Sequence, residues 1–593
     1  MSAILILIFS ILFLLFAYQY YGSFLERIVF KCKKHSIVPS HKFADGKEFV
    51  ASSKSVMFGH HFTSIAGTGP IVGPAIGVIW GWLPAVLWVL FGSIFLGAVH
   101  DFSILMISIR NKGQSIAQLS EIYLGSKLKY AFFAIICLSL WIVIAIFALI
   151  MGLIFAQFPS SVLAIWFEIP IAILMGYWVF KRNGNLFIAT IVSVLLMYLF
   201  VYLGQVFPIS LPNFQSIPSS GLWALILLLY AFIAALLPVS TLLQPRDYLN
   251  AWQLYIAIIA IVLGILSIAI SGNPLLMHAP AVNFTPNEAP SIWPFLCITI
   301  ACGAISGFHS LVCSGTSSKQ ISSEMDAKAV GYGSMLAEAF LAVLIIIAVC
   351  AGLTLSYTNL SGETFSGISA WNHHYHSWTA SAGLSSKINA VVNGCANFLI
   401  SIGLSKGFAV ATIGVLIASF AGTTLDSATR VQRYIISELL QNSPLKRFST
   451  PLISTSIAVL SALLLAFSSG FNGKGALSLW PLFGCVNQVL AAIAFCLISI
   501  YLKKTNPRYT FLALIPCVLL LILTFYALLI NQWTFYQQNN ILLFLINAGI
   551  MILALWISIA SFFKIFYHSK SNISASINHE PLYQAFTNKT SKI

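Results

Sequence analysis

Apolar stretches of about 20 residues recur along the whole chain and are separated by short loops rich in Lys and Arg. Because a helix needs about 20 apolar residues to cross a lipid bilayer, each stretch is predicted to be a transmembrane helix. Asp, Glu, Lys and Arg together make up only 8% of the 593 residues. A soluble domain carries about 25%. The composition therefore excludes a cytosolic enzyme and a secreted module.

The pattern predicts an all-α polytopic membrane protein with about fifteen transmembrane helices. Their approximate positions are 3–22, 56–77, 82–109, 129–156, 161–180, 184–206, 219–243, 251–271, 293–314, 331–355, 407–428, 451–470, 475–502, 509–530 and 540–566. A further apolar stretch, 389–405, is interpreted as a helix at the outer surface. If it crossed the membrane, every later loop would change sides.

Basic residues fall almost entirely in alternate loops, as expected of the cytoplasmic side of a membrane protein. With the N-terminus outside the cell and the C-terminus inside, the predicted outer loops hold only three lysines: Lys387, Lys406 and Lys474. The net charge of +15 is explained by this asymmetry, so no nucleic-acid partner is expected.

Residues 59–74, GHHFTSIAGTGPIVGP, are a poor membrane helix because glycines and prolines interrupt the apolar pattern. Broken backbone at membrane depth is tolerated only where protein or a water-filled cavity satisfies its polar groups. We therefore predict a discontinuous helix here. The alternative is a proline-kinked helix that packs through small residues.

Residues 303–318, GAISGFHSLVCSGTSS, have a similar composition. Gly315-Thr316 follows His309 at the spacing at which Gly67-Thr68 follows His61. The predicted topology gives the two segments opposite directions. Such a pair in inverted halves indicates the midplane site of a secondary transporter.

Two broken helices would offer free backbone N–H groups and hydroxyls to a small anionic or zwitterionic solute. The residues predicted to bind it are Thr63, Ser64, Gly67, Thr68, Gly69, Ser306, Gly307, Ser314, Gly315 and Thr316.

Ionisable residues inside the predicted helices are candidates for coupling to protons, or alternatively to Na⁺. They are His60, His61, His309, Glu338 and Asp426. Any one buried histidine could instead be structural, and Asp426 could simply pair with Arg430 one helical turn away.

The chain has no phosphate-binding GKS or GKT loop, no HExxH and no GxSxG motif. We therefore expect no catalytic residues, no metal site and no cofactor. The oligomeric state is left open.

Several long motifs resemble the carbon starvation protein A family. They are FGHHFTSIAGTGPIVGPAIG (58–77), GAVHDF (97–102), LQPRDYL (243–249), ACGAISGFHSLVCSGTSSK (301–319), YGSMLAEAF (332–340), FAGTTLDSATRVQRY (420–434) and LWPLFGCVNQVLA (479–491). The resemblance implies a transporter of the bacterial inner membrane that takes up peptides, or pyruvate with protons, during carbon starvation. It also implies a fold related to the amino acid–polyamine–organocation superfamily, with a LeuT-like core of inverted repeats.

Four regions are expected. Residues 1–50 form an anchor helix and a cytoplasmic loop, 51–505 the transporter core, 506–568 accessory helices, and 569–593 a disordered cytoplasmic tail. The leading hypothesis is a secondary active importer of peptides or small carboxylates. A passive channel, an exporter, and a membrane sensor or regulatory protein are the alternatives.

Overall fold

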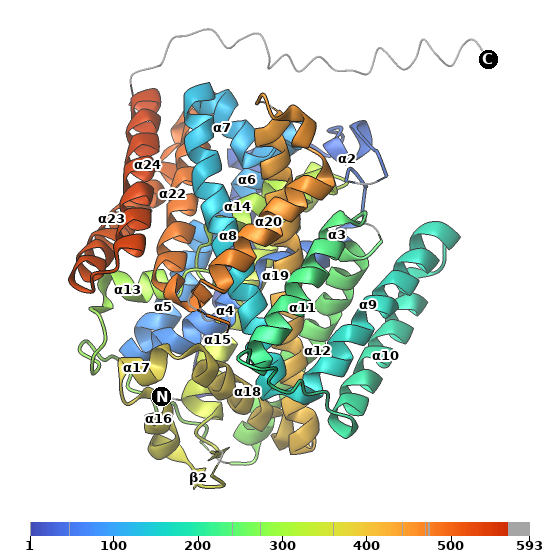
Figure 1. Ribbon diagram of the computed structural model, residues 1–593, viewed down its shortest axis with the longest axis vertical. Helices are drawn as coiled ribbons and strands as arrows, with labels where there is room; N and C mark the ends of the chain where they lie inside the picture. The colour runs from blue at the N-terminus through green and yellow to red at the C-terminus, as the bar shows by residue number, and fades with distance from the viewer. Residues whose placement is uncertain are drawn as a thin grey trace.

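The fold is a bundle of helices with one two-stranded hairpin (Figure 1). The computed structural model describes residues 2–566 except Lys47, Ser240, Asn273, Leu360, Asn442, Ser469 and 472–474. The hairpin pairs β1 (Tyr357–Thr358) with β2 (Thr364–Phe365). The expected tail, 569–593, lies outside the described residues.

The α-helices of the first half are α1 (Ala3–Phe16), α2 (Pro39–Lys42), α3 (Lys54–Ile65), α4 (Gly69–Gly77), α5 (Trp82–Gly92), α6 (Ala98–Arg110), α7 (Ile116–Leu124), α8 (Ser126–Gln157), α9 (Val162–Gly176), α10 (Leu186–Val206), α11 (Ser219–Leu236) and α12 (Leu243–Ile270). Those of the second half are α13 (Ile292–Thr299), α14 (Gly307–Gly315), α15 (Ser334–Ile347), α16 (Gly367–Tyr375), α17 (Trp378–Ala382), α18 (Leu384–Ser401), α19 (Lys406–Gln441), α20 (Pro451–Ala466), α21 (Gly475–Ser478), α22 (Trp480–Thr505), α23 (Phe511–Gln537) and α24 (Ile541–Phe566).

Within the described residues, twelve helices are long and apolar enough to cross a membrane, or thirteen if the bent pair α3 and α4 forms one span. The predicted count of fifteen is not confirmed. Two predicted spans fall short: α20 has 16 residues, and the stretch 293–314 forms two short helices, α13 and α14.

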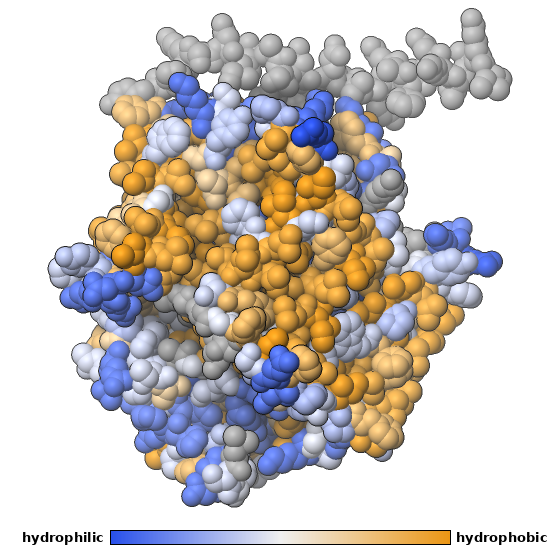
Figure 2. Space-filling model, in the orientation of Figure 1, coloured by the Kyte–Doolittle hydropathy of each residue, from blue (hydrophilic) through white to orange (hydrophobic). Residues whose placement is uncertain are grey.

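The molecular surface has the distribution expected of a membrane protein. Figure 2 shows hydrophobic side chains over the middle of the molecule and hydrophilic ones mostly toward its two ends. Figure 1 shows α2, α7 and the end of α24 at the upper face, and α16, α17, β2 and the start of the chain at the lower face.

The first predicted break is present. Helix α3 ends at Ile65, α4 begins at Gly69, and the two halves are inclined by 46°. Pro70, in the first turn of α4, has no N–H to donate back to α3, so the helix cannot continue through it.

The second predicted segment is also broken. Helix α13 ends at Thr299 and α14 begins at Gly307, so that 300–306 form turns instead of a helix. The break therefore precedes His309 in the chain, whereas the first break follows His61.

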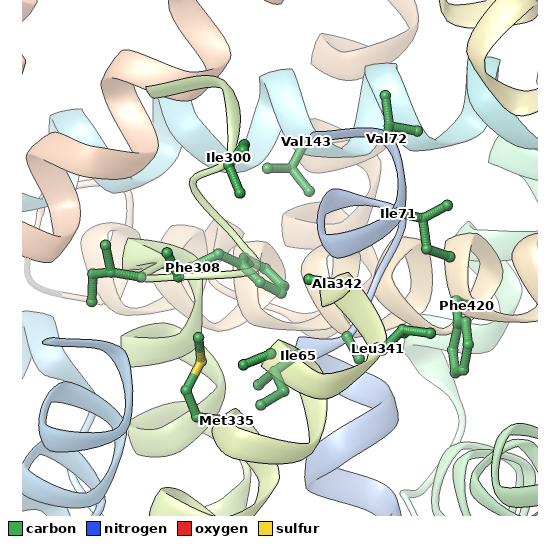
Figure 3. Packing of buried hydrophobic residues seen from close by; sticks show 14 of the residues in the cluster. Ile65, Ile71, Val72, Val143, Ile300, Phe308, Met335, Leu341, Ala342 and Phe420 are labelled. Carbon is green, nitrogen blue, oxygen red and sulfur yellow. The ribbon is translucent and has the colours of Figure 1, made fainter. Parts of the chain in front are cut away.

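The two broken segments pack directly against each other. A Cβ atom at Gly69 would lie 2.4 Å from Cys302 Sγ, and one at Gly73 would lie 2.6 Å from the Thr299 carbonyl oxygen. Figure 3 shows apolar side chains on either side of the two breaks, Ile65 and Phe308 among them, beside Met335 of α15. Close packing of bare backbone thus places both breaks in the interior.

The stretch 389–405 falls mostly in α18, which is not among the helices that are long and apolar enough to cross a membrane. It contacts the ends of neighbouring helices through bare backbone: a Cβ atom at Gly394 would lie 2.4 Å from the Ala348 carbonyl oxygen. Just before it, α16 reaches the first broken segment, since Tyr375 donates a hydrogen bond to the Ala75 oxygen of α4 at 2.6 Å.

Candidate functional site

Four buried ionisable side chains form a continuous chain beside the second break. Asp101 of α6 accepts a hydrogen bond from His100 Nδ1 at 2.7 Å and from His309 Nδ1 at 2.8 Å, one on each oxygen. On the other edge of its ring, His309 Nε2 lies 3.4 Å from Oε2 of Glu338 in α15. All four side chains are fully buried. The predicted His309 and Glu338 are thus brought together, and Asp101 joins them.

Protons alone can balance the charges of this chain. Among the described residues, no Lys or Arg forms an ion pair with Asp101 or Glu338. Two buried carboxylates without a fixed cation are strongly destabilised unless protons neutralise them or their histidine partners. Both imidazoles donate a hydrogen bond from Nδ1 to Asp101. His309 Nε2 can therefore share one proton with Glu338. The geometry is that of a group that binds and releases protons.

The two other predicted histidines have other hydrogen-bond partners. His61 Nδ1 lies 2.7 Å from Ser317 Oγ, just after α14. His60 Nδ1 lies 2.6 Å from Asp247 Oδ2 of α12. His60 therefore belongs to the contact between α3 and α12, and His61 to the contact between α3 and the end of α14.

Asp426, predicted as a coupling residue or as the partner of Arg430, pairs with neither that arginine nor the histidine chain. Its carboxylate bonds to Arg246 of α12 and accepts a hydrogen bond from Tyr230 of α11 at 2.9 Å. Arg430 instead donates to backbone oxygens at the end of α11, those of Ala234 and Leu237. The expected local pair is wrong because unpaired carbonyls at a helix end compete for the guanidinium.

The predicted solute-binding residues of the first segment lie in the last turn of α3 and at the break, and the hydroxyls of Thr63 and Ser64 already have partners. Thr63 donates to the Gly59 oxygen at 2.9 Å and to the Asp247 oxygen at 3.1 Å. Ser64 donates to Asp247 Oδ2 at 3.3 Å. Beyond them, Gly67 and Thr68 form the break, where a Cβ atom at Gly67 would lie 2.4 Å from Thr424 Oγ1 of α19.

Asn487 of α22 organises the second break and was missed by the sequence analysis as a functional residue. Its Oδ1 accepts hydrogen bonds from Ser306 Oγ at 3.1 Å and from the Phe308 backbone N–H at 2.9 Å. A Cβ atom at Gly307 would lie 2.2 Å from the Asn487 carbonyl oxygen. The available signal was an Asn-Gln pair inside an apolar stretch, at 487–488, since buried amides need partners.

The remaining three predicted residues do not lie at the second break. Ser314 Oγ donates to the Ser310 oxygen at 2.7 Å, and the Thr316 N–H still bonds to the Val312 oxygen at 3.1 Å. Gly315 is the last residue of α14. The chain then pairs Ile321 with Ser52, just before α3 begins. Gly315-Thr316 thus lies at the far end of α14, so its likeness to Gly67-Thr68 does not mark a second break.

The described residues contain no group of three or more His, Cys, Asp or Glu side chains placed to hold a metal ion. Three histidines lie at the end of α16: His373 and His376 are exposed, while His374 is buried with its Nδ1 3.2 Å from Ser386 Oγ.

Comparison with known proteins gives relatives over most of the chain. The peptide transporter CstA of Campylobacter jejuni is 32% identical over 578 residues, which cover 91% of this chain and 82% of the relative. The peptide transporter CstA of Bacillus subtilis is 32% identical over 89% of this chain and 90% of its own. The pyruvate/proton symporter BtsT of Escherichia coli is 32% identical over 89% of this chain and 81% of its own.

Solved structures give more distant similarities. The manganese transporter of Eremococcus coleocola matches with a TM-score of 0.48 and 13% identity, over 88% of this chain and 98% of its own. MhsT in complex with L-phenylalanine matches with a TM-score of 0.46 and 12% identity, over 87% of this chain and 100% of its own.

The family-level match is nearly as long as the chain. The sequence profile of the family described as carbon starvation protein CstA matches residues 2–527. This range contains both broken segments and the four linked ionisable residues His100, Asp101, His309 and Glu338. Together with relatives that are named transporters, it confirms the resemblance found in the motifs. The protein is thus a member of the carbon starvation protein CstA family.

Proposed function

We propose that the protein imports peptides or small carboxylates such as pyruvate together with protons, in the response to carbon starvation. The observation that carries the proton coupling is the contact of His309 with both Asp101 and Glu338, in the first turn after the second break. The two proposed substrate classes are taken from the names of the relatives, which are peptide transporters and a pyruvate/proton symporter.

The proposed coupling follows from the position of His309. A proton that joins His309 Nε2 or Glu338 changes the charge next to residues 300–306, where the chain forms turns between α13 and α14. Asp101 accepts the Nδ1 hydrogen of His309 and thereby orients the ring with Nε2 toward Glu338. Binding of the proton and rearrangement of the break are thereby linked.

The solute is proposed to bind between the two breaks. Seven of the predicted residues belong to the two broken segments and are kept in the proposed site: Thr63, Ser64, Gly67, Thr68, Gly69, Ser306 and Gly307. Broken helix ends present N–H groups, and these suit a carboxylate. Ser314, Gly315 and Thr316 are left out of the proposed site because they lie at the far end of α14.

The architecture proposed for this cycle has α3/α4 and α13/α14 as the two discontinuous helices of an inverted-repeat, LeuT-like core. If α13/α14 and α20 are counted with the thirteen candidates, the chain crosses the membrane fifteen times. An odd number places the two termini on opposite sides of the membrane, and the excess of Lys and Arg in the loops on the side of the C-terminus makes that side the cytoplasmic one. The grouping of α2, α7 and the end of α24 on one face supports this topology.

The experiment is uptake into proteoliposomes that contain the full chain. Labelled pyruvate and a labelled dipeptide are offered in parallel under a proton gradient, under a sodium gradient, and with a protonophore. The proposal expects accumulation of one of the two solutes that requires the proton gradient. Flux without accumulation would indicate a channel, outward transport an exporter, and no flux of either solute a sensor.

Two histidine variants then test the assignment. His309→Ala is expected to abolish proton-driven accumulation, whereas His61→Ala, which lies outside the acidic chain, is expected to retain it in part. If His309→Ala transports as well as the wild type at every pH, the proposed coupling site is wrong.

A further inference from the structure

A second group of buried charges lies on four helices away from the histidine chain. It consists of Arg246 at the start of α12, Glu168 in α9 and Asp426 in α19, with Tyr230 of α11 between them. The three charged side chains are 5%, 3% and 0% exposed. One guanidinium therefore faces two carboxylates in the interior of the protein.

The two carboxylates are not held equally. Arg246 Nη1 donates to Asp426 Oδ2, and Tyr230 donates to the same oxygen at 2.9 Å. Glu168 Oε1 lies 3.4 Å from Arg246 Nε, its Oε2 accepts the Ser419 hydroxyl hydrogen at 3.0 Å, and the Asn250 amide is a further donor to the carboxyl group. Asp426 thus has the closer charged partner.

Among the other ionisable groups near this cluster, Arg430 lies one turn after Asp426 in α19, donates to the Ala234 and Leu237 backbone oxygens, and forms no ion pair with a carboxylate of the described residues. Asp247, next to Arg246 in the chain, turns to α3 and bonds to His60 at 2.6 Å and Ser64 at 3.3 Å. Helix α10, which packs on α9, has no charged residue in its sequence. Residue Asn250 of α12 donates to Thr423 of α19 and carries no charge.

The charges of the cluster then leave one negative charge in excess. An uncompensated charge in a buried site is strongly unfavourable, and a single proton on one carboxyl removes it. Because Asp426 accepts from both Arg246 and Tyr230, it is the better stabilised carboxylate, and the proton belongs on Glu168.

We propose that Glu168 is a second proton-binding site of this protein and that it holds its proton while Arg246 is paired with Asp426. A cavity of about 20 Å³ beside it is lined by Trp166, Glu168, Tyr230, Arg246, Ser419 and Gly422, among others. This volume accommodates one water molecule. On release, only the Glu168 O–H bond breaks, the proton passes to that water, and Arg246 gains a second ion pair. Coupling of this step to transport rests on the proposed function, whereas the proton on Glu168 does not.

Infrared difference spectroscopy of the purified full chain tests the proton directly, without a substrate. The wild type is expected to show the carbonyl stretch of a protonated carboxyl group that disappears in Glu168→Gln. The same band is also expected to disappear in Asp426→Asn, because Arg246 then has one carboxylate to balance and Glu168 ionises. Retention of the band in either variant overturns the proposal.

Two further variants are controls for the assignment of the band to Glu168. Ser419→Ala removes the hydrogen bond to Glu168 but no ionisable group, so the band is expected to stay and to shift in frequency. Glu363→Gln replaces an exposed loop carboxylate near β2 and is expected to leave the band unchanged. A band that does not move in Ser419→Ala belongs to another residue and also overturns the assignment.

Transport measurements separate this inference from the proposed function. Exchange of labelled for unlabelled solute needs no net proton movement, so Glu168→Gln is expected to retain exchange while proton-driven accumulation falls at least tenfold. Normal accumulation in Glu168→Gln, together with loss of the infrared band, would overturn its role in coupling. If the wild type itself shows no proton dependence, the proposed function fails while the infrared result still decides the state of Glu168.

Discussion

His309 Nδ1 lies 2.8 Å from Asp101 Oδ2, and this contact joins the first turn of α14 to the first turn of α6. It connects a helix that begins at a break to one that belongs to a long span, Trp82–Arg110. Because the second oxygen of Asp101 is occupied by His100, the carboxylate is fixed in place. A change of charge on His309 therefore changes the electrostatic interactions at the beginning of α14.

Asp101→Asn is expected to weaken proton binding at His309, because the imidazolium loses its charged partner. A hydrogen bond to a charged group contributes about 1.5–3 kcal/mol, which corresponds to a roughly ten- to hundredfold change in proton affinity. Proton-driven uptake should therefore need a more acidic outside solution. The measurement is the initial rate of uptake as a function of external pH.

Ser103→Ala is the matched control for this variant. Ser103 lies on α6 two residues from Asp101, is fully buried, and its hydroxyl has no hydrogen-bond partner among the described residues. Its pH profile should coincide with that of the wild type. An Asp101→Asn profile that also coincides would show that the carboxylate does not act on the coupling proton.

The glycines at the two ends of α14 should respond differently to alanine. At Gly307 the added Cβ would lie 2.2 Å from the Asn487 carbonyl oxygen, which belongs to a backbone that cannot move freely. Overpacking of this kind costs about 1–3 kcal/mol or more. Gly307→Ala is therefore expected to lower the melting temperature and the yield of folded protein in detergent.

At Gly315 the nearest atom to an added Cβ is Val431 Cγ2 at 3.5 Å, an ordinary contact. Gly315→Ala should leave the free energy of unfolding unchanged or raise it by up to about 1 kcal/mol, since alanine favours a helix. Equal losses in the two variants would contradict the placement of the break at the beginning of α14.

Much of the fold was predictable because its causes are local. The apolar stretches specify helices, and Pro70 with Gly67 and Gly69 specifies the first break within a few residues. The likeness of Gly315-Thr316 to Gly67-Thr68 misled because a dipeptide does not reveal whether it interrupts a helix pair at a break or only ends one helix.

The ion pairs could not be predicted because they are far apart in the chain. Asp426 is four residues from Arg430 but bonds to Arg246, 180 residues away. Sequence spacing favours Arg430 as the partner of Asp426, whereas the packing of α12 against α19 brings Arg246 into contact with it. Asp101 and His309, 208 residues apart, are a second example. The sequence shows that each is ionisable but does not show that they are in contact.

The contact between the two breaks predicts a specific rescue. Gly69→Ala would place a Cβ atom 2.4 Å from Cys302 Sγ and 2.5 Å from Cys302 Cβ, so it is expected to reduce uptake severely. Adding Cys302→Gly removes both of these atoms. The double variant should recover at least part of the uptake and of the melting temperature.

Gly414→Ala serves as the comparison, because the nearest atom to its added Cβ is Phe158 Cβ at 3.5 Å. It should behave like the wild type with or without Cys302→Gly. If Cys302→Gly restores nothing in Gly69→Ala, the two broken segments are not in contact in the protein that was assayed.

Lys387 of α18 predicts a pH dependence of stability. Its side chain is fully buried, its Nζ donates to the His374 oxygen at 2.8 Å, and it lies 3.5 Å from the centre of the Tyr375 ring. Burial lowers the pKa of the Lys387 ammonium group well below its usual value. The unfolded chain therefore binds more protons than the folded one below the unfolded pKa of about 10.4. Stability must rise with pH in that window.

Lys387→Met should remove this dependence, because methionine has no proton to bind. The wild type is expected to lose up to about 1.4 kcal/mol per pH unit as the pH falls from about 10.4 toward the lowered pKa of Lys387, and the variant to lose less. The measurement is the unfolding free energy, or the melting temperature, of both proteins at several pH values. Lys406→Met, at an exposed lysine where α19 begins, should keep the wild-type slope. A Lys387→Met slope equal to that of the wild type would show that Lys387 is charged in the folded protein, because a lysine protonated in both states contributes nothing to the slope.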